Sequence, residues 1–269
     1  MSAVIEKRSG PRTIEQLTAT ASASRVSAFH QCRLRFFFQY IKGIEKTKSA
    51  ALHVGSCTHL VLKHWNQARW KGESPTLKQF HDVYSDAWKS EQNDAPVNWE
   101  EDSEDEEKKV GWKLFEMYYR ESEIPPNEKP EAVEVKVEAD LSHHGLPNLV
   151  GIIDLVRPTG RIVDFKTSST TPNPRIVELL NEIQLASYGL MYRQCTGKKE
   201  TAVELHHLVK TKNPKFVKTE MPPITQKQED RLYRALDSYT VGVQREDWVP
   251  SPSMLCASCQ FFNECKAHS

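Results

Sequence analysis

Three charged side chains between residues 151 and 166 have the types and spacing of a catalytic site. Two runs rich in Ile and Val flank residues 157–160, a turn cluster with Pro and Gly, which predicts a β-hairpin. Asp164 and Lys166 lie two apart in the second run and so share a face, and Asp154 lies in the first run. Because an unpaired buried carboxylate is costly, these groups need a charge to face. A divalent cation is the simplest candidate, and a surface salt bridge is the alternative.

Two helices before the hairpin must position further polar groups. We predict one helix over residues 24–43 and a second that is opened by Gly55 and Ser56, with His59 in its first turns. A histidine there could ligate a metal or touch phosphate. A lone histidine is, however, more often packed in the core.

The segments on either side of the hairpin predict more of the sheet and a helix against it. Residues 131–140 alternate apolar and polar side chains, as a half-buried strand does, and Glu134 and Glu138 could join a metal site or face solvent. In the helix predicted after the hairpin, Gln184 and Tyr188 are four apart and share a face. Further strands near 201 and 215 and a surface helix from 225 follow.

The remaining segments contribute less to a site. Residues 1–22 are polar without periodicity and are expected to form a flexible arm, ahead of a single domain over residues 23–269. Residues 76–123 are helical in pattern and are expected to form an insert that caps the substrate path. The acidic run at residues 100–107 suits a helix start, where negative charge complements the dipole, and mimicry of phosphates is the weaker alternative.

The overall charge excludes a generally basic nucleic-acid binder, because 36 Lys and Arg balance 36 Asp and Glu. A local basic surface could come from Arg33, Arg35 and Lys42, with the aromatic residues 36–38 stacking on a single strand; equally, those aromatics are core. No apolar run reaches the ~18 residues of a membrane span, and the first residues lack the apolar core of a signal peptide. We therefore expect a soluble, cytoplasmic protein.

Three cysteines close together near the C-terminus suit a metal centre better than packing. Cys256, Cys259 and Cys265 form C-x2-C-x5-C, which in a reducing compartment is poor evidence for disulfides. Cys32 is the best fourth ligand, because it would staple distant parts of the chain together. Four thiolates suit an iron–sulfur cluster or tetrahedral zinc, and His268 as a substitute ligand would favour zinc.

In their order along the chain, these parts resemble a RecB-like nuclease of the PD-(D/E)XK superfamily, in the iron–sulfur branch that includes AddB-type nuclease domains and CRISPR-associated RecB-like nucleases. The matching motifs are Ser22, Ser24 and Cys32, the G-x-x-x-H helix from Gly55 to His59, the G-x-x-D strand from Gly151 to Asp154, the D-x-K strand from Asp164 to Lys166, the Q-x-x-x-Y helix from Gln184 to Tyr188, and the three closing cysteines. The departures are small. Arg33 follows Cys32 where many relatives have Pro, and no helicase motifs are present, which suggests a stand-alone enzyme.

The resemblance implies an α/β fold: a restriction-endonuclease-like mixed central sheet flanked by helices, with a helical N-terminal and insert region and a Cys-rich tail. It implies a Mg2+- or Mn2+-dependent deoxyribonuclease, namely an exonuclease that hydrolyses phosphodiester bonds at single-stranded DNA ends in repair or recombination. A helicase, recombinase or integrase partner is left open.

The resemblance also assigns roles to residues. The metal ligands would be His59, Asp154, Asp164 and the main-chain carbonyl of Phe165. Lys166 would orient the attacking hydroxide, and Gln184 and Tyr188 would position Lys166 or the DNA backbone. Residues 23–43 and 250–269 would form a clip around a [4Fe-4S] cluster held by Cys32, Cys256, Cys259 and Cys265, or around Zn2+ at the same site.

A different class of function is also consistent with this fold. The chain could be a DNA-end-binding or adaptor subunit of a recombination, repair or CRISPR adaptation complex that has kept the fold without turnover. The complete set of acidic residues and lysine argues against it. Binding of DNA ends without cutting in Mg2+ or Mn2+ would favour it.

Overall fold

A six-stranded mixed sheet forms the centre of the molecule. The computed structural model describes residues 10–94, 96–99 and 103–268. The strand order is β1–β5–β6–β7–β8, and β4 also pairs with β5. The strands are β1 (Thr20–Ala21), β4 (Ala132–Ala139), β5 (Asn148–Arg157), β6 (Arg161–Ser168), β7 (Ala202–Val209) and β8 (Lys215–Met221).

The predicted hairpin is confirmed as β5 and β6. The two strands are antiparallel and are joined by the turn Pro158–Gly160, in which Thr159 and Gly160 have φ of 67° and 71°. The chain then returns through α7 (Val177–Thr196) to β7, which runs parallel to β6. All the residues of β7 are buried, as expected for a strand that is covered on both faces.

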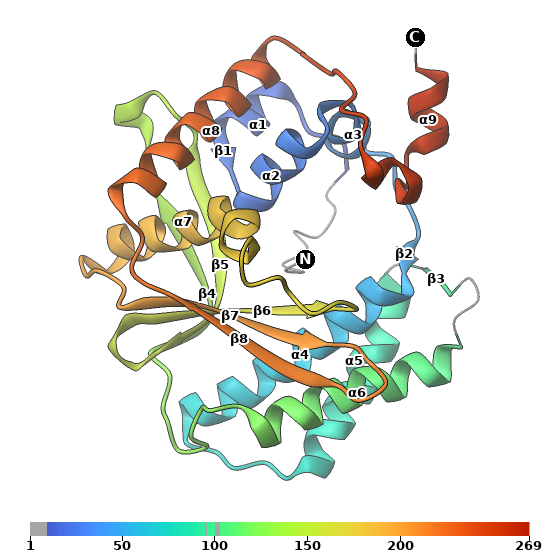
Figure 1. Ribbon diagram of the computed structural model, residues 1–269, viewed down its shortest axis with the longest axis vertical. Helices are drawn as coiled ribbons and strands as arrows, with labels where there is room; N and C mark the ends of the chain where they lie inside the picture. Colours follow the sequence, from blue (N-terminus) through green and yellow to red (C-terminus); the bar gives the residue numbers. More distant parts are fainter. Residues whose placement is uncertain (1–9, 95, 100–102, 269) are drawn as a thin grey trace.

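Helices cover both faces of this sheet (Figure 1). On one face lie α1 (Ile14–Ala19), α2 (Ala23–Gln31), α7 and α8 (Gln226–Gln244); on the other lie α4 (Ala50–Lys71), α5 (Leu77–Asp94) and α6 (Glu104–Glu121). Each face has its own apolar core: Ile153, Ile162 and Leu205 belong to the first, and Leu155, Val163 and Phe165 to the second. No helix among the residues that the structure describes is long and apolar enough to cross a membrane.

Glycine permits close contact between helix and sheet at two of the predicted motifs. A Cβ atom on Gly55 of α4 would lie 2.8 Å from Thr167 Oγ1 of β6, and one on Gly151 of β5 would lie 2.8 Å from Met191 Cε of α7. The glycines therefore allow α4 and α7, which carry predicted site residues, to approach the strands that carry the others.

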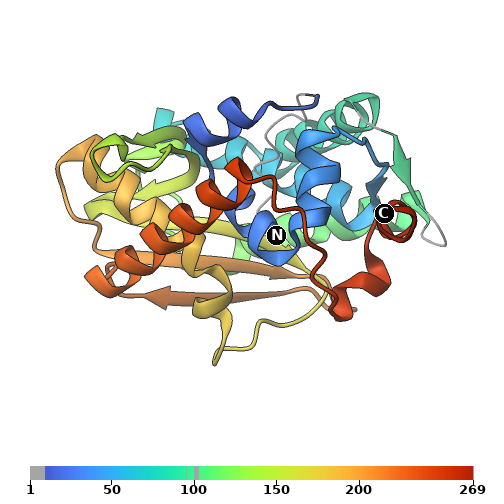
Figure 2. The ribbon, with the colours of Figure 1, turned by 90° about the horizontal axis from the view of Figure 1, so that it is seen from above.

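The C-terminal segment packs beside the N-terminal helices, away from the central sheet (Figures 1 and 2). It comprises η4 (Met254–Ser258) and α9 (Phe262–Ala267), and it lies near α3 (Arg33–Phe36) and η1 (Phe37–Ile41). Ion pairs join Arg33 to Asp247 and Lys46 to Glu264. A short pair of strands, β2 (Lys48–Ser49) and β3 (Val97–Asn98), connects α4 to the α5–α6 region.

Three expectations about the N-terminal part need correction. Within the segment expected as a flexible arm, α1 and β1 are folded and Leu17 is fully buried; residues 1–9 lie outside the described residues. The helix expected over residues 24–43 is instead α2, α3 and η1, because Cys32 has an extended backbone and breaks it. The helix α4 begins at Ala50, since Ser49 rather than Gly55 or Ser56 caps it by accepting a hydrogen bond from Leu52 N–H.

The helical pattern predicted for residues 76–123 is confirmed by α5 and α6. The first half of the acidic run includes residues 100–102, which lie outside the described residues, and the second half forms the first turn of α6. The aromatic residues of the basic N-terminal helix belong to the core, since Phe36 and Phe38 are buried. Arg33 pairs with Asp247 and is not a free cation for nucleic acid.

Candidate active site

The site lies where β5 and β6 separate. Their paired positions end at Leu155 and Val163, so the strands diverge beyond that point. The backbone N–H of Phe165 donates instead to Asp154 Oδ2, at 2.9 Å. The Asp154 side chain thus replaces a missing sheet hydrogen bond, which fixes the carboxylate between the two strands.

On β6, Asp164 and Lys166 are joined to α7 in a hydrogen-bonded group. Lys166 Nζ lies 2.9 Å from Asp164 Oδ2 and donates to Gln184 Oε1. Gln184 Nε2 donates to Asp164 Oδ1 at 3.0 Å, and Tyr188 Oη donates to the same oxygen at 3.2 Å. The i, i+4 spacing of Gln184 and Tyr188 places both on the turn of α7 that faces β6. The structure therefore brings these four predicted residues together.

His59 enters the site from α4. Its Nδ1 lies 3.8 Å from Asp154 Oδ2, and its ring contacts Phe165 edge to face. Burial, together with the charge of Lys166, lowers the pKa of His59 to about 4, although Asp164 opposes this shift. The imidazole is therefore neutral at physiological pH, which is the form that binds a metal.

The two acidic residues are among the most buried charged groups of the protein, with Asp154 2 % and Asp164 0 % exposed. Burial, and after it the charges of Asp164 and Glu134, raises the pKa of Asp154 well above its usual range. Such a shift is typical of a site that gathers like charges for a purpose other than stability.

Among the described residues, two buried polar atoms at this site have no hydrogen-bond partner, His59 Nε2 and Asp154 Oδ1, and Asp164 Oδ2 faces only the Lys166 ammonium, at 2.9 Å. Carboxylate oxygens and imidazole are donors that Mg2+ and Mn2+ accept, so the residues fit a hard divalent cation. No three His, Cys, Asp or Glu side chains in the described part of the chain are already placed as metal ligands. The reason is local, because the Phe165 N–H engages Asp154 and the Lys166 ammonium neutralises Asp164. Cation binding requires these side chains to adjust.

His207, which lies opposite Lys166 on β7, was not predicted as a site residue. It is buried, its Nδ1 has no hydrogen-bond partner among the described residues, and burial together with the Lys166 charge lowers its pKa to about 4. The only available signal was the alternation of the segment TAVELHHLVK, which places His207 on the same face as Leu205.

The four cysteines of the predicted clip lie near one another, beside the N-terminal helices. Cys32, Cys259 and Cys265 pack around Leu34, Phe38 and Phe261. Burial raises the pKa of Cys265, and the neighbouring thiols of Cys32, Cys259 and Cys256 raise it further. All four are free thiols, and within the described residues no three of them converge as metal ligands.

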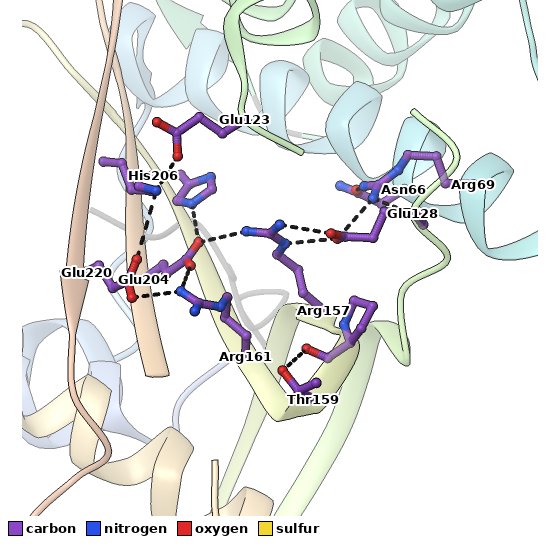
Figure 3. Close-up of polar contacts among 12 residues, drawn as sticks. Asn66, Arg69, Glu123, Glu128, Arg157, Thr159, Arg161, Glu204, His206 and Glu220 are labelled. Atoms are coloured by element: carbon purple, nitrogen blue, oxygen red, sulfur yellow. Dashed lines mark hydrogen bonds and ion pairs between the residues drawn. The ribbon is translucent and has the colours of Figure 1, made fainter. Parts of the chain in front are cut away.

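A second polar cluster, beside the start of β6, is saturated with partners and has the character of a structural network (Figure 3). Arg157 makes two hydrogen bonds of 2.9 Å to Glu128, and Arg161 pairs with Glu204 at 2.6 Å. Although burial opposes it, hydrogen bonds from His206 and Arg161 lower the pKa of Glu204 to about 2. These ion pairs join α4, the segment after α6, and strands β5 to β7, so they hold the sheet next to the site.

Comparison with known proteins agrees with this geometry. The family model of the PD-(D/E)XK nuclease superfamily matches residues 20–266. A crystal structure described as "Putative exonuclease" from Eubacterium rectale aligns with a TM-score of 0.62 and 16% identity, over 92% of this chain and 89% of that one. The structure of SSO0001 aligns with a TM-score of 0.38 and 15% identity, over 88% and 93% of the two chains, which is too distant to support an argument. No protein of curated function matches.

Members of this superfamily are phosphodiester-hydrolysing nucleases that generally use divalent metals such as Mg2+. The family match covers the strands β5 and β6, the helices α4 and α7, and the six residues that meet between them. The chain therefore belongs to the PD-(D/E)XK nuclease superfamily.

Proposed function

We propose that this protein is a metal-dependent DNA exonuclease that acts on single-stranded ends. The observation that carries the proposal is the buried group of Asp154, Asp164 and Lys166, which Gln184 holds by hydrogen bonds and His59 completes. Two carboxylates and a lysine held together in a protein interior are costly, and a site for a cation and a phosphate accounts for them.

In this proposal, the residues that would hold Mg2+ or Mn2+ are His59, Asp154, Asp164 and, through its main-chain carbonyl, Phe165; a bound cation would supply Lewis-acid polarisation of the scissile phosphate and a lowered pKa for the attacking water. Lys166 leaves Asp164 for the phosphate and stabilises the charge of the transition state. Gln184 keeps the ammonium in place through its carbonyl oxygen, while its amide nitrogen fixes Asp164. Tyr188 supports the same carboxylate oxygen.

A groove beside the site supports a single-stranded substrate. A cavity of about 500 Å3 lies between α4 and β4 and is lined by residues that include Trp70, Lys71 and Lys136. Trp70 is 49% exposed, and an exposed aromatic ring beside lysines suits the stacking of unpaired bases. Trp70 and Lys71 lie about three turns beyond His59 on the same helix.

The test uses end-labelled single- and double-stranded DNA with and without Mn2+. Asp164→Ala and Lys166→Ala should each reduce cleavage of single strands by at least about 10²-fold, with an unchanged circular dichroism spectrum. Lys198→Ala, which removes an exposed lysine from the α7–β7 connection, is the matched control and should cleave normally. Undiminished cleavage by both site variants would refute the proposal, and a wild-type protein that binds ends without cutting would favour the adaptor function instead.

The cysteines are proposed to hold a [4Fe-4S] cluster as a structural clip between residues 23–43 and 250–269. Support comes from the packing of Cys32 with Cys259 and Cys265 around one small apolar cluster. Protein purified without oxygen should be brown, with a broad visible absorption band that Cys259→Ser removes. Colourless protein with one zinc per chain would overturn the cluster in favour of a zinc site.

A further inference from the structure

Glu134 lies directly across from Asp154 on the neighbouring strand. The paired positions on either side of it are Val133 with Leu155 and Val135 with Ile153, which leaves Glu134 opposite Asp154. Directly opposite side chains on antiparallel strands lie close together. The register therefore places a third carboxylate next to the two that the hairpin supplies.

In both strands, the alternation of side chains between the two faces of the sheet is interrupted at Glu134 and Asp154. Val133 packs in the core beside α4–α6, whereas Val135 packs in the core on the opposite face of the sheet. Leu155 and Ile153 differ in the same way. In a regular strand, residues two apart share a face, so the alternation is interrupted at Glu134 and at Asp154 together. The distortion is centred on the two carboxylates.

The backbone of Glu134 is in the left-handed region, with φ of 50°, although the residue is not glycine. Such a conformation is strained for a side chain with a Cβ, and it is concentrated at functional sites, where the surrounding structure enforces it. Within β4 the strain has no turn to explain it, since the strand continues to Ala139. It is consistent with a strand that bends to direct one side chain.

Glu134 is only partly exposed, and burial raises the pKa of its carboxyl, although the charge of Lys63 opposes this shift; no hydrogen bond to its carboxylate is found among the described residues. Glu138, on the same strand, differs in both respects: it is exposed, and it accepts a hydrogen bond from Asn148 Nδ2 at 3.1 Å. Glu134 also lines the groove between α4 and β4, which gives ions from solvent a path to it. A half-buried carboxylate that accepts no hydrogen bond from the described residues calls for an explanation.

We propose that Glu134 is a third carboxylate of the cation site and binds a divalent cation together with Asp154. The second observation that points to a ligand there is Asp154 Oδ1, which is buried and has no hydrogen-bond partner in the described part of the chain. The inference rests on the proposed function of the same site. It adds a ligand from β4, an element that supplies none of the other proposed ligands.

Calcium binding, measured by titration calorimetry on the full chain, tests this without relying on cleavage. Glu134→Gln should weaken Ca2+ affinity by about tenfold or more, whereas Glu138→Gln, the matched control on the same strand, should bind as the wild type does. Asp164→Ala should also lose affinity, because it removes a carboxylate that the proposed function already requires.

Thermal unfolding in EDTA separates a ligand from a structural residue. Removing one of three neighbouring negative charges should raise the unfolding midpoint of Glu134→Gln above that of the wild type, and Glu134→Gly, which also relieves the backbone, should raise it further. A lowered midpoint for Glu134→Gln would mean that the carboxylate serves the fold, and would overturn the inference. If Asp164→Ala loses Ca2+ binding while Glu134→Gln binds Ca2+ normally, Glu134 is not a ligand, and the proposed function of the site is unaffected. If the wild type binds no Ca2+, or Asp164→Ala binds it unchanged, the proposed site itself fails, and this inference with it.

Discussion

Replacing Asp154 by asparagine should stabilise the metal-free protein, although it removes a residue from the centre of the site. Asp154 is 2 % exposed, and its Oδ1 atom has no hydrogen-bond partner among the residues that the structure describes, so the cost of burying this carboxylate is not fully offset. Asparagine keeps an oxygen that can accept the Phe165 N–H bond of 2.9 Å. It also carries no charge to repel Asp164.

The size of the effect follows from the burial. A buried, unsatisfied polar group costs about 1–3 kcal/mol. For a chain of this size, each kcal/mol shifts the unfolding midpoint by roughly 2–4 °C, so Asp154→Asn should raise it by roughly 2–12 °C in EDTA.

The increase in folding stability caused by Asp154→Asn should also depend on pH. Burial raises the pKa of Asp154 above its ordinary value of 3.8, so the folded protein keeps a proton that the unfolded chain has already released. Folding stability therefore falls as the pH rises above that ordinary value and through the folded pKa. At a pH below both the unfolded and the folded pKa of Asp154, this residue should cost neither protein any stability. The stability of Asp154→Asn relative to the wild type should then increase towards neutral pH.

Urea unfolding in EDTA at a series of pH values measures this difference. In a parallel series, Ca2+ at about 100 times its dissociation constant should stabilise the wild type by about 2.7 kcal/mol and the variant much less. Asn148→Asp, which places a carboxylate at the half-buried start of β5, controls for a general charge effect in this strand. A variant that is less stable than the wild type at every pH, or an advantage that does not change with pH, would refute the reasoning.

Two further variants test the surroundings of the site. Gln184→Leu removes the hydrogen bond between α7 and Lys166. It should lower kcat about 10- to 100-fold with little change in the unfolding midpoint. If the unfolding midpoint falls along with kcat, Gln184 has a structural role instead. Arg157→Ala removes one of the cations that pair with the fully buried Glu204, and it should lower the free energy of unfolding by about 3–5 kcal/mol. Arg120→Ala removes an exposed i, i+4 ion pair, and it should change the free energy of unfolding by less than about 1 kcal/mol. Comparable losses in the two arginine variants would contradict the distinction between buried and exposed pairs.

Local patterns were sufficient to predict the longer strands, β4 to β8, and most helices, but not the two-residue strands β1, β2 and β3. The hairpin follows from two Ile- and Val-rich runs around a Pro–Gly turn, and α7 follows from its long apolar periodicity. The proximity of Asp164 to Lys166, and of Gln184 to Tyr188, follows from periods of two and four residues. These relations join residues that are close in the chain, so they can be predicted from a single sequence.

Other features depend on distant partners, and the sequence could not provide them. The break at Cys32 falls within a pattern that reads as one helix, and α1 is held by contacts with α8. The position of Glu134 across from Asp154 depends on the strand register, and its φ of 50° depends on the distortion of two strands. His207 comes next to Lys166 only because β6 and β7 are parallel neighbours.

The packing of α8 against α1 and α2 has a consequence for synthesis on the ribosome. Tyr239 Oη of α8 donates to the Leu17 carbonyl at 3.0 Å across 222 residues, and the Tyr239 ring meets that of Phe29. At about 5–20 residues per second, the N-terminal helices emerge roughly 10–45 s before the helix that covers them. During that interval the surface of α1 and α2 that α8 covers lacks its native partner, so the packing of this region is complete only after α8 has been translated.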